Sequence, residues 1–287
     1  MQDKIGNKKI IGKELSNNNL RAKKKFGQNF LINQDILNGI VSRSLIDKNT
    51  LAIEVGPGLG SLTEHLCENA GYVLAYEIDT ELLPILDENL SKFSNKTIIN
   101  KDILDVDIED DIKKYKGDLE NVYMVANLPY YITTPIILGT LEKTKMIRKY
   151  TLMVQLEVAD RICGKPKTKD YNALSIAIGY RAKAVKVLDV NRKNFMPAPN
   201  VDSAVIRLDL YDNPPYTAKN EEHFFRFIRE CFTQRRKTLV NNLCQANNYN
   251  KDKVLEMLKA LNIKESVRSE ELSIEDFVKM SDYLSME

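Results

Sequence analysis

The sequence predicts an α/β fold, a mainly parallel sheet with helices on both faces, followed by a small all-α C-terminal domain. An apolar run at residues 51–55 stops at the glycine turn Gly56-Pro-Gly-Leu-Gly60, and leucines at helical spacing follow it. Short apolar runs then alternate with helical patterns up to residue 208, which is typical of a parallel sheet with helical crossovers. After Asn213-Pro-Pro-Tyr216, the apolar residues recur with helical period only.

These patterns place the individual elements. Apolar runs bounded by polar or turn residues predict strands at 51–55, 72–77, 97–100, 122–126, 151–156 and 203–208. In the last part of the chain, Ser273-Ile-Glu-Asp276 predicts a capped helix start. We therefore expect a flexible N-terminal extension at 1–22, an α/β domain at 23–212 and a helical domain at 213–287.

Composition excludes several classes of protein. The chain has 287 residues, of which 43% are hydrophobic and 29% charged, so it is neither collagen-like nor wholly disordered. No apolar run approaches the roughly 18 residues of a membrane span, and no secretory signal is visible, so we expect a cytoplasmic protein. The four cysteines form no C-x-x-C pair, and the two histidines lie far from any nucleophile signature. We therefore expect no metal and no triad hydrolase.

The basic residues are clustered, although 42 of them nearly cancel 40 acidic residues to give a net charge of +2. Residues 1–30 contain eight Lys or Arg residues. A second basic group lies at residues 226–237. Two such clusters would suit a polyanion laid across both domains, although a solvated surface explains the charges equally well.

The glycine turn and two acidic residues predict a nucleotide site. A strand that enters a helix through glycines brings backbone N–H groups close to a ligand. Because Ser61 occupies the third glycine position of the dinucleotide fingerprint, S-adenosyl-L-methionine fits better than a pyrophosphate. Glu77 ends the second strand, where it could bind the ribose hydroxyls, and Asp102 follows the third, where it could accept from the adenine amino group.

Asn127-Leu-Pro-Tyr130, directly after the fourth strand, predicts methylation of an exocyclic amine. The adenine N6 lone pair is delocalised, so it attacks poorly unless acceptors such as the Asn127 side-chain oxygen and the Leu128 carbonyl bind its hydrogens. Pro129 would stiffen the turn, and Tyr130 would stack on the base. Phe195, in the Pro-rich loop, would close on the other face of a flipped base, with core packing as its alternative.

Five motifs stand out in the chain: Lys25-Phe-Gly-Gln-Asn-Phe-Leu31, Glu54-Val-Gly-Pro-Gly-Leu-Gly60, Asn127-Leu-Pro-Tyr-Tyr-Ile-Thr-Thr-Pro135, Phe195-Met-Pro-Ala-Pro-Asn-Val-Asp-Ser-Ala-Val205 and Phe232-Thr-Gln-Arg-Arg-Lys-Thr-Leu239. Together they resemble the ribosomal RNA small-subunit adenine-N6 dimethyltransferases. The resemblance runs from about Lys23 to the C-terminus and implies a Rossmann-like S-adenosyl-L-methionine-dependent domain with an RNA-binding helical domain. It also implies that two adjacent adenosines in the 3′-terminal hairpin loop of small-subunit rRNA are dimethylated late in subunit assembly.

The resemblance also implies roles for single residues. Asn29 and Leu31 would close over the cofactor, which becomes S-adenosyl-L-homocysteine on reaction. Small-subunit rRNA within a pre-30S ribosomal particle is the implied partner, and we expect a monomer. The implied cofactor contacts are Gly56, Gly58, Glu77, Asp102 and Asn127, and the implied RNA contacts are Lys23, Lys24, Lys25, Arg235, Arg236 and Lys237.

Other functions stay open at this point. The macrolide-resistance methyltransferases, which modify an adenosine of large-subunit rRNA, share Gln-Asn-Phe-Leu and a similar Pro-rich loop. The Gly-Pro-Gly-Leu-Gly turn, Asn-Leu-Pro-Tyr-Tyr and Val-Asp-Ser-Ala-Val favour the small-subunit enzyme. A non-catalytic RNA-binding assembly factor would keep the same fold. A NAD-linked oxidoreductase is disfavoured by Ser61 and by the lack of a proton-relay signature.

Overall fold

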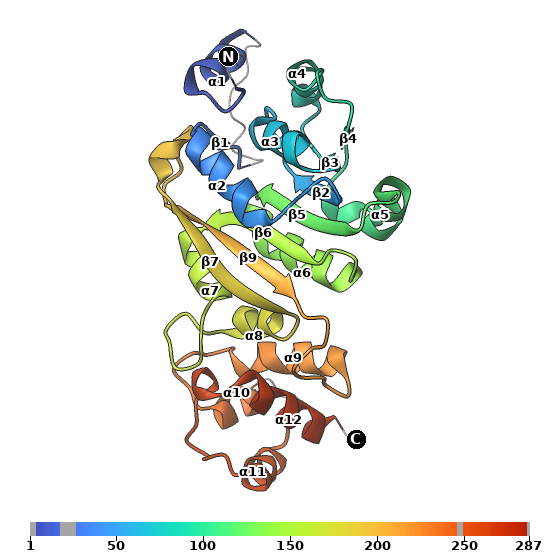
Figure 1. Ribbon diagram of the computed structural model, residues 1–287. Helices are drawn as coiled ribbons and strands as arrows, with labels where there is room; N and C mark the ends of the chain where they lie inside the picture. The colour runs from blue at the N-terminus through green and yellow to red at the C-terminus, as the bar shows by residue number, and fades with distance from the viewer. Residues whose placement is uncertain (1–3, 18–26, 246–248, 286–287) are drawn as a thin grey trace. The chain divides into compact units, whose positions relative to one another are not determined.

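The computed structural model describes residues 4–17, 27–245 and 249–285, and the chain divides into two compact units (Figure 1). The first unit comprises residues 1–159 and 185–209, and the second comprises residues 160–184 and 210–287. Each unit has its own buried core.

The first unit is built on a seven-stranded sheet of order β4-β3-β2-β5-β6-β9-β7. Strands β4, β3, β2, β5 and β6 pair in parallel, and β9 runs antiparallel to β6. The chain reverses its direction of growth between β2 and β5, which is where open α/β sheets bind ligands. The strands are β2 (Thr50–Val55), β3 (Tyr72–Tyr76), β4 (Lys96–Ile99), β5 (Asn121–Asn127), β6 (Lys149–Gln155), β7 (Ala182–Val190) and β9 (Ser203–Leu210).

Helices cover both faces of this sheet, and the predicted fold class is confirmed. Helices α2 and α3 pack against each other and bury one face over Ala52, Val73 and Val125, while α5 packs against β3 and α6. No helix in the described ranges is long and apolar enough to cross a membrane. The helices are α1 (Lys8–Asn17), α2 (Gln34–Ser44), α3 (Ser61–Asn69), α4 (Leu83–Asn89), α5 (Ile108–Lys116), α6 (Thr133–Lys143) and α7 (Leu156–Ile162), with short 3₁₀ turns η2 (Thr80–Leu82), η3 (Ile103–Asp105), η4 (Tyr130–Ile132) and η5 (Arg192–Asn194).

Three strands were not predicted. Two of them, β1 (Phe30–Leu31) and β8 (Phe195–Met196), have two residues each and pair with one another across the chain. A two-residue strand has no measurable period, so only the long-range pairing defines it. Strand β7 is longer, but Lys183, Lys186 and Asp189 interrupt its apolar residues, so it has no continuous apolar run. Most of its residues are accordingly half-exposed or exposed.

The N-terminal extension differs from the prediction. Residues 1–22 were expected to be flexible, whereas residues 8–17 form α1, and Ile5 and Ile11 are only 6% and 0% exposed. These two isoleucines belong to a buried cluster with residues of the first unit, so burial stabilises a helix that has weak local signals. Residues 18–22 lie outside the described ranges.

The second unit is helical. Aromatic residues Phe224, Phe227 and Phe277 form much of its core, and the predicted capping box of Ser273 and Asp276 is confirmed at the start of α12. The boundary was expected near residue 212, yet residues 160–184 also belong to this unit, because Tyr180 packs its ring 4.7 Å from that of Phe224. The helices are α8 (Ala173–Gly179), α9 (Glu221–Cys231), α10 (Leu239–Gln245), α11 (Lys251–Ala260) and α12 (Ile274–Leu284), with the 3₁₀ turn η6 (Ser269–Glu271).

Candidate active site

Four sequence-predicted residues meet in one pocket of the first unit. Gly56, Glu77, Asp102 and Asn127 follow or end four neighbouring parallel strands, so their carboxyl ends lie at the same edge of the sheet. All four line a pocket with about 1000 Å³ of empty space, part of it open to solvent. Residues that are up to 71 positions apart in the sequence (56 to 127) therefore surround one volume.

The glycine turn takes a conformation that other residues avoid. Gly56, Gly58 and Gly60 have φ angles of +70°, +61° and +91°. A Cβ atom on Gly58 would lie 3.2 Å from the Phe30 ring, so the ring would have to shift to make room for a side chain there. Gly60 is the N-cap of α3, which directs backbone N–H groups of the turn and the positive end of the helix dipole toward the pocket.

Glu77 lines the pocket and is held by backbone donors. The Gly58 N–H donates to its Oε2 (3.1 Å) and the Asp79 N–H donates to its Oε1 (2.9 Å). The side chain is only 4% exposed, and burial raises the pKa of the carboxyl, while the hydrogen bonds from Asp79 and Gly58 lower it. Each carboxylate oxygen has a second lone pair, so Glu77 can accept two hydroxyl hydrogens from a ribose.

Asp102 lies at the start of the turn η3. The Leu104 N–H donates to its Oδ1 (2.9 Å), which fixes the carboxylate at the edge of the pocket. Its neighbours Lys101 and Ile103 also line the pocket. An acceptor at this strand end suits the amino group of an adenine ring.

The predicted reacting residues lie at the end of β5. Asn127 donates from Nδ2 to the Asn29 carbonyl (3.4 Å), and the Leu128 N–H donates to the Met153 carbonyl (3.1 Å). Pro129 follows with a φ angle of −58°. Asn29 and Leu31, the residues implied to close over the cofactor, line the same pocket.

Tyr130 is fixed by a hydrogen bond that the sequence did not predict. Its hydroxyl lies 2.7 Å from the Ser203 Oγ, at the first residue of β9. Burial raises the pKa of the Tyr130 hydroxyl, and the Ser203 hydrogen bond lowers it by a smaller amount. The ring is thereby held at its hydroxyl end, and Tyr130 lines the pocket.

The structure buries Phe195, for which the sequence predicts either stacking on a flipped base or core packing. Its side chain is only 3% exposed and packs in the hydrophobic core with Leu31, Leu37 and Val205. It pairs with Leu31 across β1 and β8 and is not among the residues that line the pocket. Phe195 thus packs in the core of this structure, and its stacking on a flipped base stays a prediction.

Several pocket residues were missed by sequence reasoning. Tyr131 is 54% exposed and lines the pocket, where burial, then Asp102, then Glu77 raise the pKa of its hydroxyl. Glu54, on β2, is 1% exposed, and burial raises the pKa of its carboxyl to about 8. An acidic residue inside the otherwise apolar run Leu51-Ala-Ile-Glu-Val55 was the available signal.

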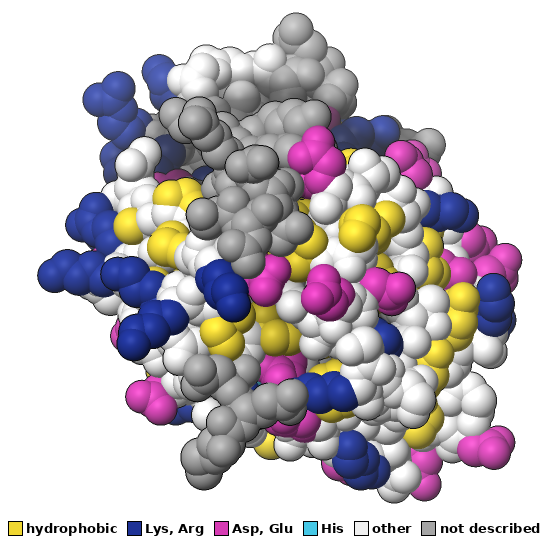
Figure 2. All heavy atoms as spheres, turned by 90° about the horizontal axis from the view of Figure 1, so that it is seen from above, with side chains coloured by type: hydrophobic (Ala, Val, Ile, Leu, Met, Phe, Trp, Pro, Cys, Tyr) yellow, Lys and Arg dark blue, Asp and Glu magenta, His cyan; other side chains and the backbone are white. Residues whose placement is uncertain are grey.

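The implied RNA contacts are partly described. Lys23, Lys24 and Lys25 lie outside the described residues. In the second unit, Arg235, Arg236 and Lys237 are exposed, and Arg235 Nε lies 3.6 Å from the Glu270 carboxylate. On the face shown in Figure 2, a group of Lys and Arg side chains lies on the left, and elsewhere on this face Lys and Arg side chains are interspersed with Asp and Glu. Basic charge is thus locally concentrated on a chain with a net charge of +2.

The fold and this pocket define a Rossmann-like methyltransferase. The chain belongs to the Ribosomal RNA adenine dimethylase family, whose family model matches residues 19–286, and the resemblance identified from the motifs is confirmed. It is 49% identical over 266 residues to "Ribosomal RNA small subunit methyltransferase A" of Lysinibacillus sphaericus (strain C3-41), covering 91% of this chain and 90% of that protein. It is 47% identical over 264 residues to the protein of the same name from Lachnoclostridium phytofermentans, with 91% of each covered.

Two solved structures share the fold over most of the chain. A dimethyladenosine transferase from Plasmodium falciparum matches with a TM-score of 0.71 and 26% identity, covering 87% of this chain and 95% of that one. The 23S rRNA methyltransferase ErmE matches with a TM-score of 0.67 and 26% identity, covering 90% of this chain and 100% of that one. Among the described residues of this chain, no group of three or more His, Cys, Asp or Glu side chains could hold a metal ion.

Proposed function

We propose that this protein is an S-adenosyl-L-methionine-dependent rRNA (adenine-N6,N6)-dimethyltransferase that modifies two adjacent adenosines in the 3′-terminal hairpin loop of small-subunit rRNA. One observation carries the proposal: Glu77, Asp102 and Asn127 surround a single pocket beside the glycine turn. Relatives that are 43% to 49% identical are named small-subunit methyltransferases, which supports the choice of RNA.

The pocket residues fit S-adenosyl-L-methionine. The glycine turn would approach the methionine part closely, since Gly56 and Gly58 line the pocket and carry no Cβ. Glu77 would accept from the ribose hydroxyls and Asp102 from the adenine amino group. When bound, the cofactor supplies an electrophilic methyl group on a sulfonium.

Asn127 and Leu128 would prepare the target amine. The Asn127 Nδ2 is engaged by the Asn29 carbonyl, and this contact orients the side chain so that its Oδ1 can accept one N6 hydrogen. The Leu128 carbonyl would accept the other, and the two acceptors would stabilise positive charge that develops on the nitrogen. No general base is needed, because the alkylated nitrogen is acidic and loses its proton to these acceptors or to water.

Tyr130 would position the base. Stacking of an aromatic ring on a base contributes about 1 to 3 kcal/mol, and the Ser203 hydrogen bond holds the ring in place. In the second unit, Arg235, Arg236 and Lys237 would pair with RNA phosphates. We further propose that the protein acts in the cytoplasm as a monomer on a pre-30S ribosomal particle.

A large-subunit specificity is the second candidate, since the structure of ErmE covers 90% of this chain. The two candidates differ in which rRNA carries the methyl groups. Mass mapping of both rRNAs from cells that lack the gene distinguishes them. We expect two adjacent small-subunit adenosines to lose their methyl groups, and the proposal fails if only large-subunit adenosines do.

An in vitro assay tests the chemistry. Asn127→Ala should lower the rate of methyl transfer to small ribosomal subunits by about 100-fold, because one preorganised acceptor in the transition state is lost. Asn121→Ala, at the opposite end of the same strand, is the matched control and should keep the wild-type rate. A wild-type rate for Asn127→Ala would instead support a non-catalytic assembly factor.

A further inference from the structure

Residues 4–11, the N-terminal segment, pack behind one wall of the pocket. Ile5 and Ile11 share one buried cluster with Phe30, Leu59 and Leu82, and the last three line the pocket. The family model begins at residue 19, so this segment precedes the matched range. The wall of the pocket is therefore supported by residues outside the matched family domain.

Phe30 contacts both the buried cluster and the glycine turn. Its ring lies against the glycine turn, at 3.2 Å from the position of a Cβ on Gly58, and the Gly58 N–H donates to Glu77. The buried cluster that contains Ile5 and Ile11 thus extends, through Phe30, to the turn that holds the predicted ribose acceptor. A change in the packing of Phe30 would be transmitted to the position of Gly58, because protein interiors are close-packed.

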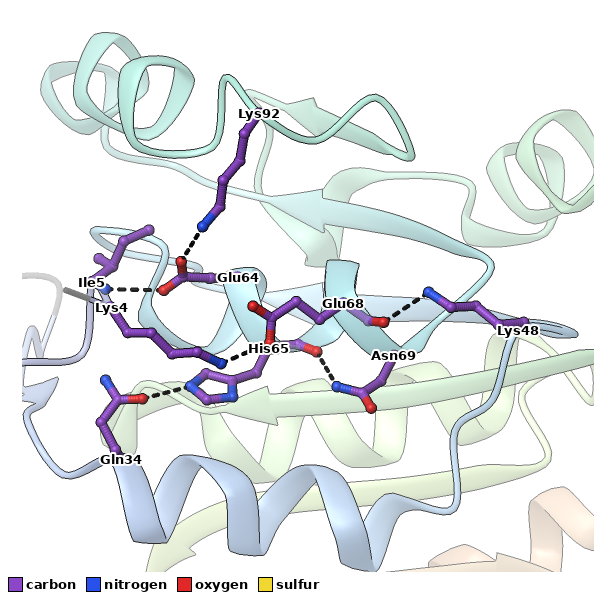
Figure 3. Close-up of polar contacts among 9 residues, drawn as sticks. All are labelled: Lys4, Ile5, Gln34, Lys48, Glu64, His65, Glu68, Asn69 and Lys92. Carbon is purple, nitrogen blue, oxygen red and sulfur yellow. Dashed lines mark hydrogen bonds and ion pairs between the residues drawn. The ribbon is translucent and has the colours of Figure 1, made fainter. Parts of the chain in front are cut away.

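Polar contacts join the same segment to α3, the helix that starts at the glycine turn (Figure 3). The Ile5 N–H donates to Glu64 Oε2 (2.9 Å), and Lys92 Nζ lies 2.7 Å from Glu64 Oε1. Glu64 is only 2% exposed, so it depends on these two donors. One helical turn further on, Lys4 Nζ lies 2.7 Å from Glu68 Oε2.

We propose that Ile5 and Ile11 are positioning residues for the cofactor: they hold Phe30, Leu59 and the first turn of α3 in the geometry that binds S-adenosyl-L-methionine. The inference rests on the proposed function, since it concerns affinity for that cofactor. Without this support, the wall side chains gain alternative packings, and the fraction of binding-competent pocket falls. Chemistry at Asn127 would be unaffected once the cofactor is bound.

Calorimetric titration with S-adenosyl-L-homocysteine, combined with methyl transfer to small ribosomal subunits, tests this on the full chain. Ile5→Ala/Ile11→Ala should raise the Kd for S-adenosyl-L-homocysteine and the KM for S-adenosyl-L-methionine at least tenfold, while kcat stays within twofold of wild type. Lys9→Ala, at an exposed position of α1, the helix that contains Ile11, is the matched control and should change neither constant. Ile11→Val removes one methylene and should raise the Kd two- to threefold, so it keeps the test valid if the double variant does not fold.

The outcomes separate the two proposals. If the wild-type protein does not bind S-adenosyl-L-homocysteine, the proposed function fails and this inference fails with it. If the wild type binds and the isoleucine variants bind equally well, only the positioning role is overturned. A loss of kcat with unchanged KM would also overturn it, because that pattern indicates a general structural role.

Discussion

Replacing Glu54 with Gln tests whether a buried carboxyl beside the pocket opposes folding at alkaline pH. Glu54 lies on the central strand β2 and is 1% exposed. No described residue provides a hydrogen-bond partner for its Oε2. Burial raises the pKa of this carboxyl to about 8, the Thr63 hydroxyl lowers it by a smaller effect, and the charge of Glu77 raises it further. Gln has nearly the same shape but does not ionise.

The magnitude follows from the difference between the folded and unfolded pKa values. The pKa rises from 4.5 to about 8 on folding, and one pKa unit corresponds to 1.36 kcal/mol, so ionised Glu54 costs the folded state up to about 5 kcal/mol. Because the folded state binds the proton more tightly, this cost is absent below pH 4.5, grows as the pH rises and is complete above pH 8. The advantage of Glu54→Gln should therefore increase over this range.

Differential scanning calorimetry of the wild type and Glu54→Gln between pH 5 and pH 9 measures this pH-dependent difference in stability. At about 2 °C of Tm per kcal/mol for a chain of this size, the Tm of Glu54→Gln should exceed that of the wild type by about 10 °C at pH 9. The two should differ little at pH 5. Glu120→Gln, at an exposed position of the first unit, is the control and should show no pH-dependent difference. Parallel curves of Tm against pH for Glu54→Gln and wild type would refute the reasoning.

Three further predictions concern the pocket and the RNA contacts. Ser203→Ala removes the hydrogen bond to Tyr130, which is worth about 1 kcal/mol. In single-turnover assays the rate constant of methyl transfer should therefore fall about fivefold, while the Kd for S-adenosyl-L-homocysteine stays constant. An unchanged rate constant would argue against the positioning of Tyr130. Glu77→Gln should weaken S-adenosyl-L-homocysteine binding by roughly 10- to 100-fold in calorimetry, since hydrogen bonds to a charged group contribute about 1.5 to 3 kcal/mol, and equal affinity would exclude the ribose role. Arg236→Ala/Lys237→Ala should reduce the slope of log affinity for RNA against log salt by about 1.5 to 2, and an unchanged slope would show that neither contacts phosphate.

The strand ends could be predicted because their signals are local. Each predicted pocket residue from Gly56 to Asn127 lies at the end of an apolar run or within a few residues after it, and a parallel sheet brings the carboxyl ends of such runs together whatever the details of packing. The spacing of Gly56, Gly58 and Gly60 is equally local, because the positive φ angles of the turn require those residues.

The placement of Phe195 could not be predicted, because no local signal determines it. It lies in a loop without period, and its neighbours are set by the pairing of β8 with β1, which joins Phe195 to Leu31. Ile5 and Ile11 likewise have no strong helical pattern around them, and their burial depends on Phe30, Leu59 and Leu82. In both cases long-range packing determines which side chains are buried, and a single sequence does not show those contacts.

Long-range contacts also explain how the reacting end of the pocket is assembled. Asn127 is tied to Asn29, 98 positions away, and Tyr130 is tied to Ser203, 73 positions away. The pairing of β1 with β8 joins the segment that contains Asn29 to the Pro-rich loop that precedes Ser203. The three segments are therefore connected to one another around β5. Because each contact fixes a different group of the proposed site, the amide of Asn127 and the ring of Tyr130 can be held in place although Asn127 is the last residue of β5 and Tyr130 the first residue of the short turn η4.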